Sequence, residues 1–156
     1  MESINPWYVT GLIEGEGSFS ISFSLRKKLN VGIETRPSFS VTLNQRDLPL
    51  IKSIHQYFGC GAIRFSKSDR TYKFEVRSIQ ELVKKVNPHF VKYPLKGEKR
   101  KDFDTFEELC RMIHANLHLN VSYMQTIVER ACTMNPSGKR KYQQQDLLKV
   151  LGKVKV

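Results

Sequence analysis

Two glutamates, Glu14 and Glu16, lie between glycines in the segment VTGLIEGEG, residues 9–17. The apolar residues before them predict a short helix with both acids at its C-terminal end. Carboxylates are disfavoured there by ~0.3–1 kcal/mol each, because the unpaired carbonyls of the last turn are already negative. A cation would relieve that cost, and Mg²⁺ prefers one or two carboxylates together with water and phosphate oxygens. From this chemistry alone, a metal site and a pair of surface acids beside a turn both stay open.

Two of these glycines, Gly11 and Gly15, are four residues apart and therefore lie on one side of the predicted helix. Without side chains, that side would let a second helix approach closely. Acids at the C-terminal end of a helix, where carboxylates are disfavoured, are typical of functional sites when they stand beside such a contact. We expect the acids and the glycines to belong to one feature.

The charge of the chain points to the kind of partner. Its 156 residues include 26 Lys and Arg against 15 Asp and Glu, a formal net charge of +11 with a pI near 9.7. Such a surplus indicates a polyanion: DNA, RNA or an anionic membrane. No apolar run approaches the ~20 residues that span a bilayer, which disfavours the membrane. The first residues, MESINPW, lack the basic and apolar regions of a signal peptide, so we expect a protein that is not secreted.

The three cysteines, Cys60, Cys110 and Cys132, are far apart and form no CxxC pair. This spacing predicts buried free thiols, without disulfides or a zinc cluster. A reducing compartment fits them, and the bacterial cytoplasm and an organelle matrix fit equally well.

The hydrophobic pattern predicts a helix, then strand–strand–helix twice, then several helices. The strands are expected at 18–26, 38–43, 62–67 and 72–77, where apolar and polar residues alternate. Capping residues predict helix starts at Asn5, Asp47, Ser78, Asp104 and Ser122, a helix end at Gly59 and another before Pro88. This order indicates an α+β fold, with helices on one face of an antiparallel sheet. No linker divides the chain, so we predict a single domain over 1–156.

The other face of the predicted sheet would be polar and basic, which is also what any solvated sheet face requires. Arg can bridge N7 and O6 of guanine, and short hydroxyls can bond several base edges, so this face suits the major groove of duplex DNA. Few aromatic residues are expected on it, which disfavours stacking on single strands or RNA. The expected DNA-binding residues on the strands and their turns are Ser20, Ser22, Ser24, Arg26, Lys28, Arg36, Ser38, Ser40, Thr42, Arg64, Ser66, Lys67, Arg70, Lys73, Glu75 and Arg77.

The segment TGLIEGEGSFSI, residues 10–21, resembles the LAGLIDADG motif of homing endonucleases. Both glycines, the apolar positions, the spacing of the acids and the strand that follows all match. INPW, FGCGAI and KYPL extend the likeness over roughly 4–120, and they are similar to the fungal organellar branch, which usually carries two motifs in one longer chain. The resemblance implies the order α-β-β-α-β-β-α with a saddle-shaped antiparallel sheet. The further helices that we expect at the C-terminal end would follow it.

The resemblance also implies roles for individual residues. Glu16 would hold a catalytic divalent metal (Mg²⁺, with Mn²⁺ or Ca²⁺ as substitutes) beside the scissile phosphate, and the Gly15 carbonyl would be a further ligand. Glu14 would be mainly structural, and with Gly11 and Gly15 it would lie at the helix–helix contact of a homodimer.

A lysine near the phosphate is also implied. Lys99 fits best, and Lys96 and Lys101 stay open. Some members of the family place a glutamine at the end of the second strand. Leu43 stands there in this chain, and Gln45 is a weaker candidate for the same role.

Other patterns in the sequence give weaker evidence about function. His114 and His118 are four apart but lack the glutamate of HExxH, so a partly buried pair is favoured over zinc binding. The cluster Lys139–Arg140–Lys141 and the C-terminal lysines are expected to contact the DNA backbone.

Together these features predict a site-specific DNA endonuclease that acts with a divalent metal, as a homodimer, on a long pseudo-palindromic target. The sequence indicates neither a membrane partner nor a small-molecule substrate. An intron RNA maturase and a non-catalytic DNA-binding relic of the same fold are the alternatives.

Overall fold

The computed structural model describes residues 3–136, 138 and 140–154. Contacts between Cα atoms divide the chain into two compact units, each made of two stretches of sequence. Unit 1 comprises Met1–Phe19 and Ser38–Arg100, and unit 2 comprises Ser20–Pro37 and Lys101–Val156. The single domain expected over 1–156 stays a prediction.

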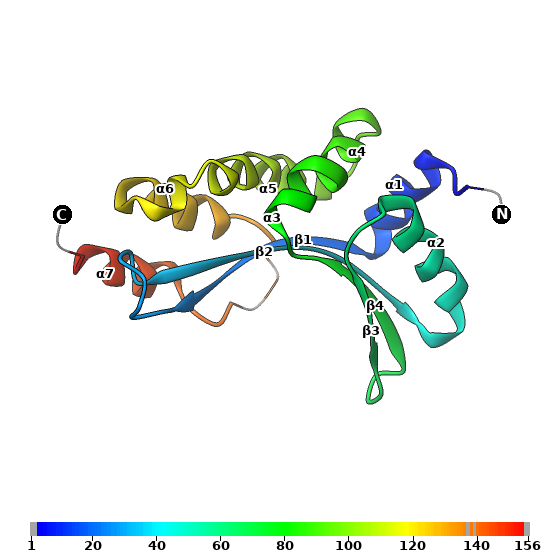
Figure 1. Cartoon of the computed structure of the whole chain (residues 1–156), viewed down its shortest axis with the longest axis horizontal. Coiled ribbons are helices and arrows are strands. Elements are labelled where there is room, and N and C mark those ends of the chain that lie inside the picture. Colours follow the sequence, from blue (N-terminus) through cyan, green and yellow to red (C-terminus); the bar gives the residue numbers. More distant parts are fainter. Residues whose placement is uncertain (1–2, 137, 139, 155–156) are drawn as a thin grey trace. The chain divides into compact units, whose positions relative to one another are not determined.

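The elements follow the predicted order, and four strands form one sheet in the order β1-β2-β4-β3 (Figure 1). The β2–β4 and β3–β4 pairs are antiparallel, and a tight turn joins β1 to β2. The predicted α+β class with additional C-terminal helices is confirmed. The elements are α1 Pro6–Glu16, β1 Gly17–Leu25, β2 Ile33–Asn44, η1 Gln45–Asp47, α2 Leu48–Phe58, β3 Ala62–Ser66, β4 Thr71–Val76, α3 Ile79–Glu81, η2 Leu82–Val86, α4 Asn87–Lys92, α5 Lys99–His114, η3 Leu117–Leu119, α6 Val121–Ala131 and α7 Gln144–Gly152.

Unit 1 is built around Phe39 of β2, which is completely buried. Its ring stacks on Phe19 at 5.3 Å and meets Phe58 of α2 and Phe90 of α4 edge-on at 5.3 and 5.5 Å. Aromatic pairs of this kind contribute about 0.5–1.5 kcal/mol beyond the area they bury. The alternating apolar positions of the strands therefore face the helices, as predicted. The hairpin of β3 and β4 projects past the helices of its unit, and Phe65 stays about half exposed there, at 49% (Figure 1).

Unit 2 packs the rest of β1 and β2 with α5, α6 and α7. Ile21 and Phe23 of β1 and Ile33 of β2 are buried, as are the apolar residues along one side of each helix. The turn between the strands approaches α7 closely: a Cβ at Gly32, where φ is +76°, would lie 3.0 Å from Cγ1 of Val150. Pro37 lies in β2 outside its pairing with β4, which begins at Phe39, so its missing N–H removes no bond from that ladder.

Some predicted helix ends are confirmed. Asn5 caps α1, with its Oδ1 accepting from the Trp7 N–H at 2.8 Å, and Pro6 takes the first helical position. Ser78 caps α3 through its hydroxyl, and Gly59 ends α2 in the left-handed conformation.

The predicted start at Asp47 is confirmed in position, because Asp47 is the N-cap residue of α2, but its side chain makes no capping bond and Asn44 caps the short 3₁₀ turn before it. Two other predicted helix starts are wrong. Asn120, not Ser122, caps α6, and α5 begins at Lys99, five residues before Asp104.

The helical segment predicted to stop before Pro88 continues through it. Residues Leu82–Val86 form a π-helical turn, in which the Asn87 N–H donates to the Leu82 carbonyl five residues earlier. Pro88 then takes an early position of α4, where a helix leaves its first N–H groups unpaired. The wider turn accommodates a proline that would break a regular α-helix.

Cysteine and histidine placements differ in part from expectation. Cys60 and Cys110 are buried free thiols, but Cys132 is only half-buried. Burial raises the pKa of both the Cys60 and Cys132 thiols. His114 ends α5 and is exposed, while His118 lies in the separate η3 turn and is half-buried, so the two do not share a helix face.

None of the helices in the described part of the chain is both long and apolar enough to cross a bilayer. In the same part, no group of three or more His, Cys, Asp or Glu side chains is placed to hold a metal ion.

His89 of α4 is a buried polar residue in the core of unit 1. Its Nε2 lies 2.9 Å from the Thr10 hydroxyl and its Nδ1 lies 2.7 Å from the Tyr57 hydroxyl. Burial lowers the pKa of His89 from the ordinary 6.5 to about 4. The folded chain therefore holds this imidazole neutral at pH values where the unfolded chain protonates it.

The low pKa of His89 makes folding sensitive to acid. Between pH 6.5 and about 4 the unfolded chain binds more protons at this site than the folded chain, so stability falls as the pH is lowered through that range. We expect His89→Gln to show a smaller loss of the free energy of unfolding over the same range, measured by urea denaturation. Equal pH dependence in both proteins would contradict the assignment.

Candidate active site and nucleic-acid interface

The end of α1 is fixed by the segment that follows α4. Oε1 of Glu14 accepts hydrogen bonds from the backbone N–H groups of Lys96 and Gly97, at 2.7 and 3.0 Å. A Cβ at Gly97 would lie 3.2 Å from Oε2 of Glu14, so a glycine leaves room for this approach. Bonds from N–H groups to a carboxylate are about twice as strong as neutral ones. Glu14 thus ties the motif helix to residues more than 80 positions later.

Lys99 reinforces the same junction from the first turn of α5. Its Nζ donates to the carbonyls of Ile13 and Glu14, at 2.9 and 3.1 Å. These carbonyls belong to the last turn of α1, where a positive charge is favourable. The cation expected from the electrostatics of this helix end is therefore supplied in part by a lysine. The same contact places Lys99 beside the acidic end of the motif. Lys96 and Lys101 are both exposed.

Glu16 differs from Glu14 in its surroundings. It is the last residue of α1, its side chain is exposed, and within the described residues it makes no hydrogen bond or ion pair. Gly15 beside it is also exposed. The end of α1 is thus held by Glu14 and Lys99, while the second carboxylate stays available to a ligand.

Gly11 and Gly15 are open to solvent on the outer side of α1. A Cβ at either position would meet nothing within 4 Å, and neither has a positive φ. Gly17 is the opposite case, because a Cβ there would lie 2.5 Å from Cγ2 of Ile13. Neither packing within this chain nor backbone conformation thus explains why positions 11 and 15 are glycines.

The predicted strand face of unit 1 is present as adjacent rows of polar side chains. The register places Ser40 opposite Glu75, Thr42 opposite Lys73, and Lys73 opposite Arg64. Residues opposite each other share a face of the sheet, so these side chains form one surface. Ser66 lies on it as well, while Lys67 and Arg70 lie in the exposed turn between β3 and β4, and Arg77 is exposed just after β4.

Glu75 organises part of this surface. Its carboxylate accepts from the Ser38 hydroxyl at 2.6 Å and pairs with Lys73 Nζ at 3.4 Å. Burial disfavours its charge, but the bond from Ser38 and the attraction of Lys73 and Arg77 outweigh that effect, so the pKa of Glu75 lies below its ordinary value. Glu75 therefore stays ionised and fixes its neighbours.

On the strand face of unit 2, an acid that the sequence analysis missed holds two expected DNA-binding residues. Oε2 of Glu34 accepts from Arg26 Nε at 2.8 Å and from Arg36 at 3.3 Å. Desolvation disfavours its charge, but bonds from Arg36 and Arg26 outweigh this and lower the pKa of Glu34. The strand was expected only from position 38, whereas β2 begins at Ile33 and brings Glu34 onto the same side as Arg36. Ser20 and Ser24 are half-buried, and Ser22 and Lys28 are exposed.

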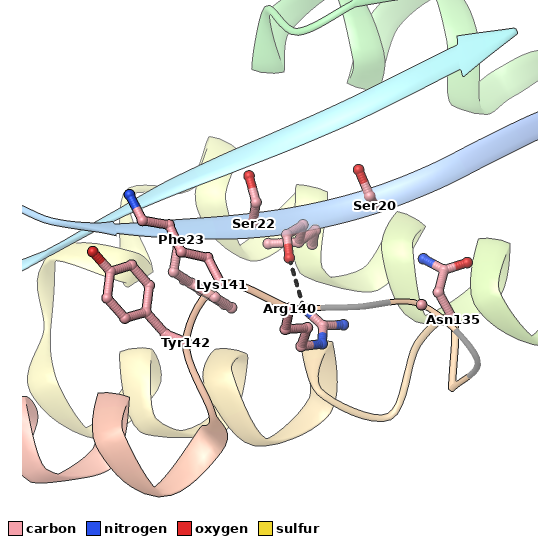
Figure 2. A pocket seen from close by; sticks show the side chains of 9 residues that line it. Ser20, Ser22, Phe23, Asn135, Arg140, Lys141 and Tyr142 are labelled. Carbon is pink, nitrogen blue, oxygen red and sulfur yellow. Dashed lines mark hydrogen bonds between the residues drawn. The ribbon is translucent and has the colours of Figure 1, made fainter. Parts of the chain in front are cut away.

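A cavity of about 260 Å³ lies along β1 in unit 2, and no acidic residue lines it. Figure 2 shows Ser20 and Ser22 on one side of the strand, with Arg140, Lys141 and Tyr142 on the other. Arg140 donates to the carbonyls of Ile21, Ala131 and Met134, so its guanidinium joins β1 to the end of α6. Lys141 is exposed, with its Nζ 5.3 Å from the centre of the Tyr142 ring. Lys139 and Lys155, expected to contact DNA, lie outside the described residues.

The end of the second strand lacks the glutamine that some members of the family place there, as expected from the sequence. Leu43 is buried in the core, and Gln45 lies exposed in η1. Leu43 therefore offers no polar group to a water molecule, and the water-positioning role has no assigned residue.

Comparison with known proteins agrees with this arrangement. The family model described as LAGLIDADG endonuclease matches residues 9–110, which include α1 from Val9 onward, the four strands and Lys99. The chain belongs to the LAGLIDADG endonuclease family. The segment that resembles its motif lies in α1 and β1, with Glu14 and Glu16 at the end of the helix.

Similar proteins include both short and long LAGLIDADG chains. A probable intron-encoded endonuclease of Neurospora crassa is 32% identical over 133 residues, 85% of this chain but 25% of that protein. The homing endonuclease I-TnaI shares the fold with a TM-score of 0.84 at 28% identity, over 99% of this chain and all of its own. I-SmaMI, solved on an uncleaved DNA target with calcium ions, gives a TM-score of 0.85 at 30% identity over 96% of this chain and 49% of its own. The chain thus spans a quarter of the Neurospora relative's length.

The Glu14 junction of the LAGLIDADG helix can be tested by its contribution to stability. We expect Glu14→Gln to lower the free energy of unfolding by about 1–2 kcal/mol, because the amide oxygen accepts the two N–H bonds without a charge. Urea denaturation measures the change. Glu129→Gln on α6 is the control, since Glu129 is exposed and, among the described residues, its side chain bonds only to Gln125, at 3.3 Å. Equal changes in both variants would contradict a special role for Glu14.

Proposed function

We propose that this chain is a site-specific homing endonuclease that hydrolyses phosphodiester bonds in a long, pseudo-palindromic duplex DNA target. The observation that carries the proposal is that the charged residues at the end of α1 have different surroundings. Glu14 and Lys99 hold the helix end through four hydrogen bonds to backbone groups, whereas Glu16 is exposed and makes no bond within the described residues. An unpaired carboxylate on a helix end that is itself held in place is suited to binding a cation at a reacting phosphate.

The residues at this site fit a divalent metal only in part. Glu16 and the Gly15 carbonyl supply oxygen ligands, and no third acidic or histidine side chain joins them in the described part of the chain. Mg²⁺ commonly binds through one or two carboxylates, with water and substrate phosphate oxygens completing its shell. A bound metal would lower the pKa of a water and stabilise charge at the phosphate. The calcium ions in the I-SmaMI complex support the choice of a hard divalent ion, and Mg²⁺ is our specific proposal.

The role proposed for Lys99 follows from its position. Its ammonium neutralises the last carbonyls of α1, so the negative end of the helix repels an approaching phosphate less. The same charge favours an anion next to Glu16. Lys99 would therefore act on the phosphate from a site that it already occupies in the free protein.

The strand faces would provide the DNA contacts, and the similar structures solved with DNA support duplex DNA as the partner. Arg64 lies exposed on the strand face of unit 1, and Arg can bond guanine with two hydrogen bonds in the major groove. Lys141 beside the acid-free cavity would instead contact a phosphate, because an ammonium there meets no carboxylate among the lining residues. Base contacts give specificity and phosphate contacts give affinity.

A homodimer is the simplest assembly for cutting both strands. The solvent-open Gly11 and Gly15 leave a surface on α1 that a second helix can approach closely, and an isologous contact would pair the same residues from two chains. I-TnaI matches this chain over its full length, while I-SmaMI contains twice the matched length. The name of the intron-encoded Neurospora relative supports an intron origin for this chain. Of the two compartments expected, we propose the organelle matrix.

A cleavage assay with Glu16→Gln tests the proposed reaction. We expect this variant to lose at least ~10³-fold in cleavage rate on DNA carrying the native insertion site, with its DNA Kd changed less than about threefold, because removing a catalytic group spares binding. A mixture of variant and wild-type chains should accumulate nicked DNA, since each mixed dimer keeps one active site.

Other outcomes of this assay separate the alternatives. Binding without cutting by the wild-type chain would make it a DNA-binding relic, and tighter binding to intron RNA than to DNA would favour a maturase. Absence of nicked product from the mixture, with a monomer mass on DNA, would contradict the dimer.

The two kinds of DNA contact predict different responses to mutation. Arg64→Ala should relax base preference at one target position by ~1–3 kcal/mol, whereas Lys141→Gln should weaken all sequences alike and reduce the salt slope of binding by ~1. Binding titrations at several salt concentrations, on a library of single-base target variants, measure both effects. Lys52→Gln is the control, because Lys52 is exposed on α2, away from the strand face. Identical profiles for Arg64→Ala and wild type would remove the base-contact assignment.

A further inference from the structure

A line of hydrogen bonds through the core of unit 1 ends on the motif helix. The Tyr57 hydroxyl of α2 lies 2.7 Å from Nδ1 of His89 in α4, and Nε2 of His89 lies 2.9 Å from the Thr10 hydroxyl of α1. The Thr10 hydroxyl donates in turn to the Tyr93 carbonyl at 2.8 Å. Four groups from α1, α2, α4 and the residue that follows α4 are thus connected in series. We refer to Tyr57, His89, Thr10 and the Tyr93 carbonyl as the His89 relay.

The direction of every bond in the relay follows from its last member. A carbonyl accepts only, so the single proton of the Thr10 hydroxyl is committed to Tyr93. Thr10 must then accept from His89, which places a proton on Nε2. A neutral imidazole with its proton on Nε2 has a bare Nδ1, and Nδ1 therefore accepts from Tyr57. The tautomer with its proton on Nε2 satisfies all three bonds. The other loses one of them, because the single proton of Thr10 cannot be donated to both Nε2 and the Tyr93 carbonyl.

The surroundings of His89 keep it in this state. The rings of Phe90, Tyr57 and Tyr93 lie 4.6 to 5.2 Å from its imidazole, and Phe58 packs at 5.6 Å. The partners of His89 in the described residues are hydroxyls and aromatic rings, and none is a carboxylate that would favour the imidazolium. Trp7 of α1 packs edge-on against Tyr93 at 5.2 Å, so the first turn of α1 joins the same cluster.

The His89 relay holds α1 at a second position along the helix axis. Val9 and Ile13 are completely buried, but apolar packing is non-directional and allows a helix small rotations about its axis. Hydrogen bonds restrict that rotation because they require aligned donors and acceptors. Glu14 and Lys99 act at the C-terminal end, and Thr10 acts six residues before Glu16, about 9 Å along the axis. Two attachment points fix both the rotation and the tilt of α1.

We infer that His89 is a positioning residue for Glu16, which acts through Thr10 to set the rotation of the motif helix. The inference rests on the proposed nuclease function, since it gives Glu16 the metal-binding role. It differs from the contacts of Glu14 and Lys99 because His89 touches neither the motif acids nor DNA. Displacements of about 1 Å far from the reacting atoms can cost about 10²-fold in rate.

Variants at Thr10 test the inference, since Thr10 joins the relay to α1. Thr10→Val keeps the size and shape of the side chain but removes its donor and acceptor, whereas Thr10→Ser keeps the hydroxyl. We expect Thr10→Val to lower the single-turnover cleavage rate about 10- to 100-fold and to raise the metal concentration for half-maximal cleavage, with the DNA Kd within about threefold. Thr10→Ser should recover the rate to within about threefold of wild type. Thr126→Val on α6 is the matched control, because Thr126 is exposed and, in the described part of the chain, its hydroxyl bonds only to the Ser122 carbonyl of its own helix.

Two further measurements test the inference even when the Thr10→Val protein folds poorly. Tyr57→Phe removes the far end of the relay without touching α1, and it should lower the cleavage rate while keeping DNA binding. Nitrogen NMR of the His89 ring in the wild-type chain should show the proton on Nε2 throughout pH 5–8. A proton on Nδ1 would overturn the relay whether or not the chain cuts DNA.

The remaining outcomes are distinguishable. Unchanged cleavage by Thr10→Val and Tyr57→Phe would overturn the positioning role. The positioning role would also be overturned if the losses of cleavage rate and of DNA binding were no larger than those of the core variant Ile54→Val at an equal loss of stability. A wild-type chain that binds its target but never cuts it would refute the proposed function instead, and the NMR measurement would still decide the His89 tautomer.

Discussion

The attachment of the C-terminal end of α1 to residues 96–99 is the constraint on which the rest of the site depends. A helix that ends in two acids and a glycine has no intrinsic reason to stop in one orientation, and exposed carboxylates would repel its own terminal carbonyls. Two side chains of opposite charge offset this repulsion, and each contacts backbone groups of the opposite polarity. The negative side chain of Glu14 receives backbone N–H groups, and the positive side chain of Lys99 meets backbone carbonyls. The remaining acid then projects from a rigid support.

Acidic residues have a comparable organising role on the strand faces. In a chain with a formal charge of +11, Glu34 and Glu75 stand among the arginines and lysines expected to meet DNA. Each acid holds two or more neighbouring side chains, so long flexible cations lose less freedom when a ligand arrives. A carboxylate on such a surface also repels phosphate and accepts only from base amines, which makes it selective. Charge pattern, rather than total charge, then distinguishes one target from another.

The sequence predicted those features that depend on short-range patterns. The alternation in β1, β2 and β4 determined which residues face the core, because a strand turns its side chains to opposite sides in strict succession. The motif segment 9–17 identified the acids and glycines, and Asn5 with Pro6 marked the start of its helix. These signals each lie within about ten residues.

Features that depend on distant partners were not predictable in the same way. The roles of Lys99 toward Ile13 and of His89 toward Thr10 join residues about 80 positions apart, and nothing local marks them. Glu34 was missed because the strand was expected only from position 38, where the alternation of apolar and polar residues was recognised, whereas β2 begins at Ile33. Asn120 caps α6 in place of the expected Ser122, and the two residues are so close in the sequence that local signals do not choose between them. The metal, the dimer and the DNA target lie beyond one chain's own contacts.

The π-helical turn before Pro88 sets a limit on how this segment can vary in length. Such a turn holds one residue more than a regular helix would, and shortening Leu82–Val86 by one residue would restore ordinary α-helical spacing. The residues after the deletion would keep nearly the same direction around the axis, because four α-helical residues cover about the same rotation as five residues of the wider turn. The ring of Pro88 would then meet the carbonyl four residues before it, as in any regular α-helix. The extra residue therefore serves the proline, and the length of this segment and the residue type at position 88 can change only together.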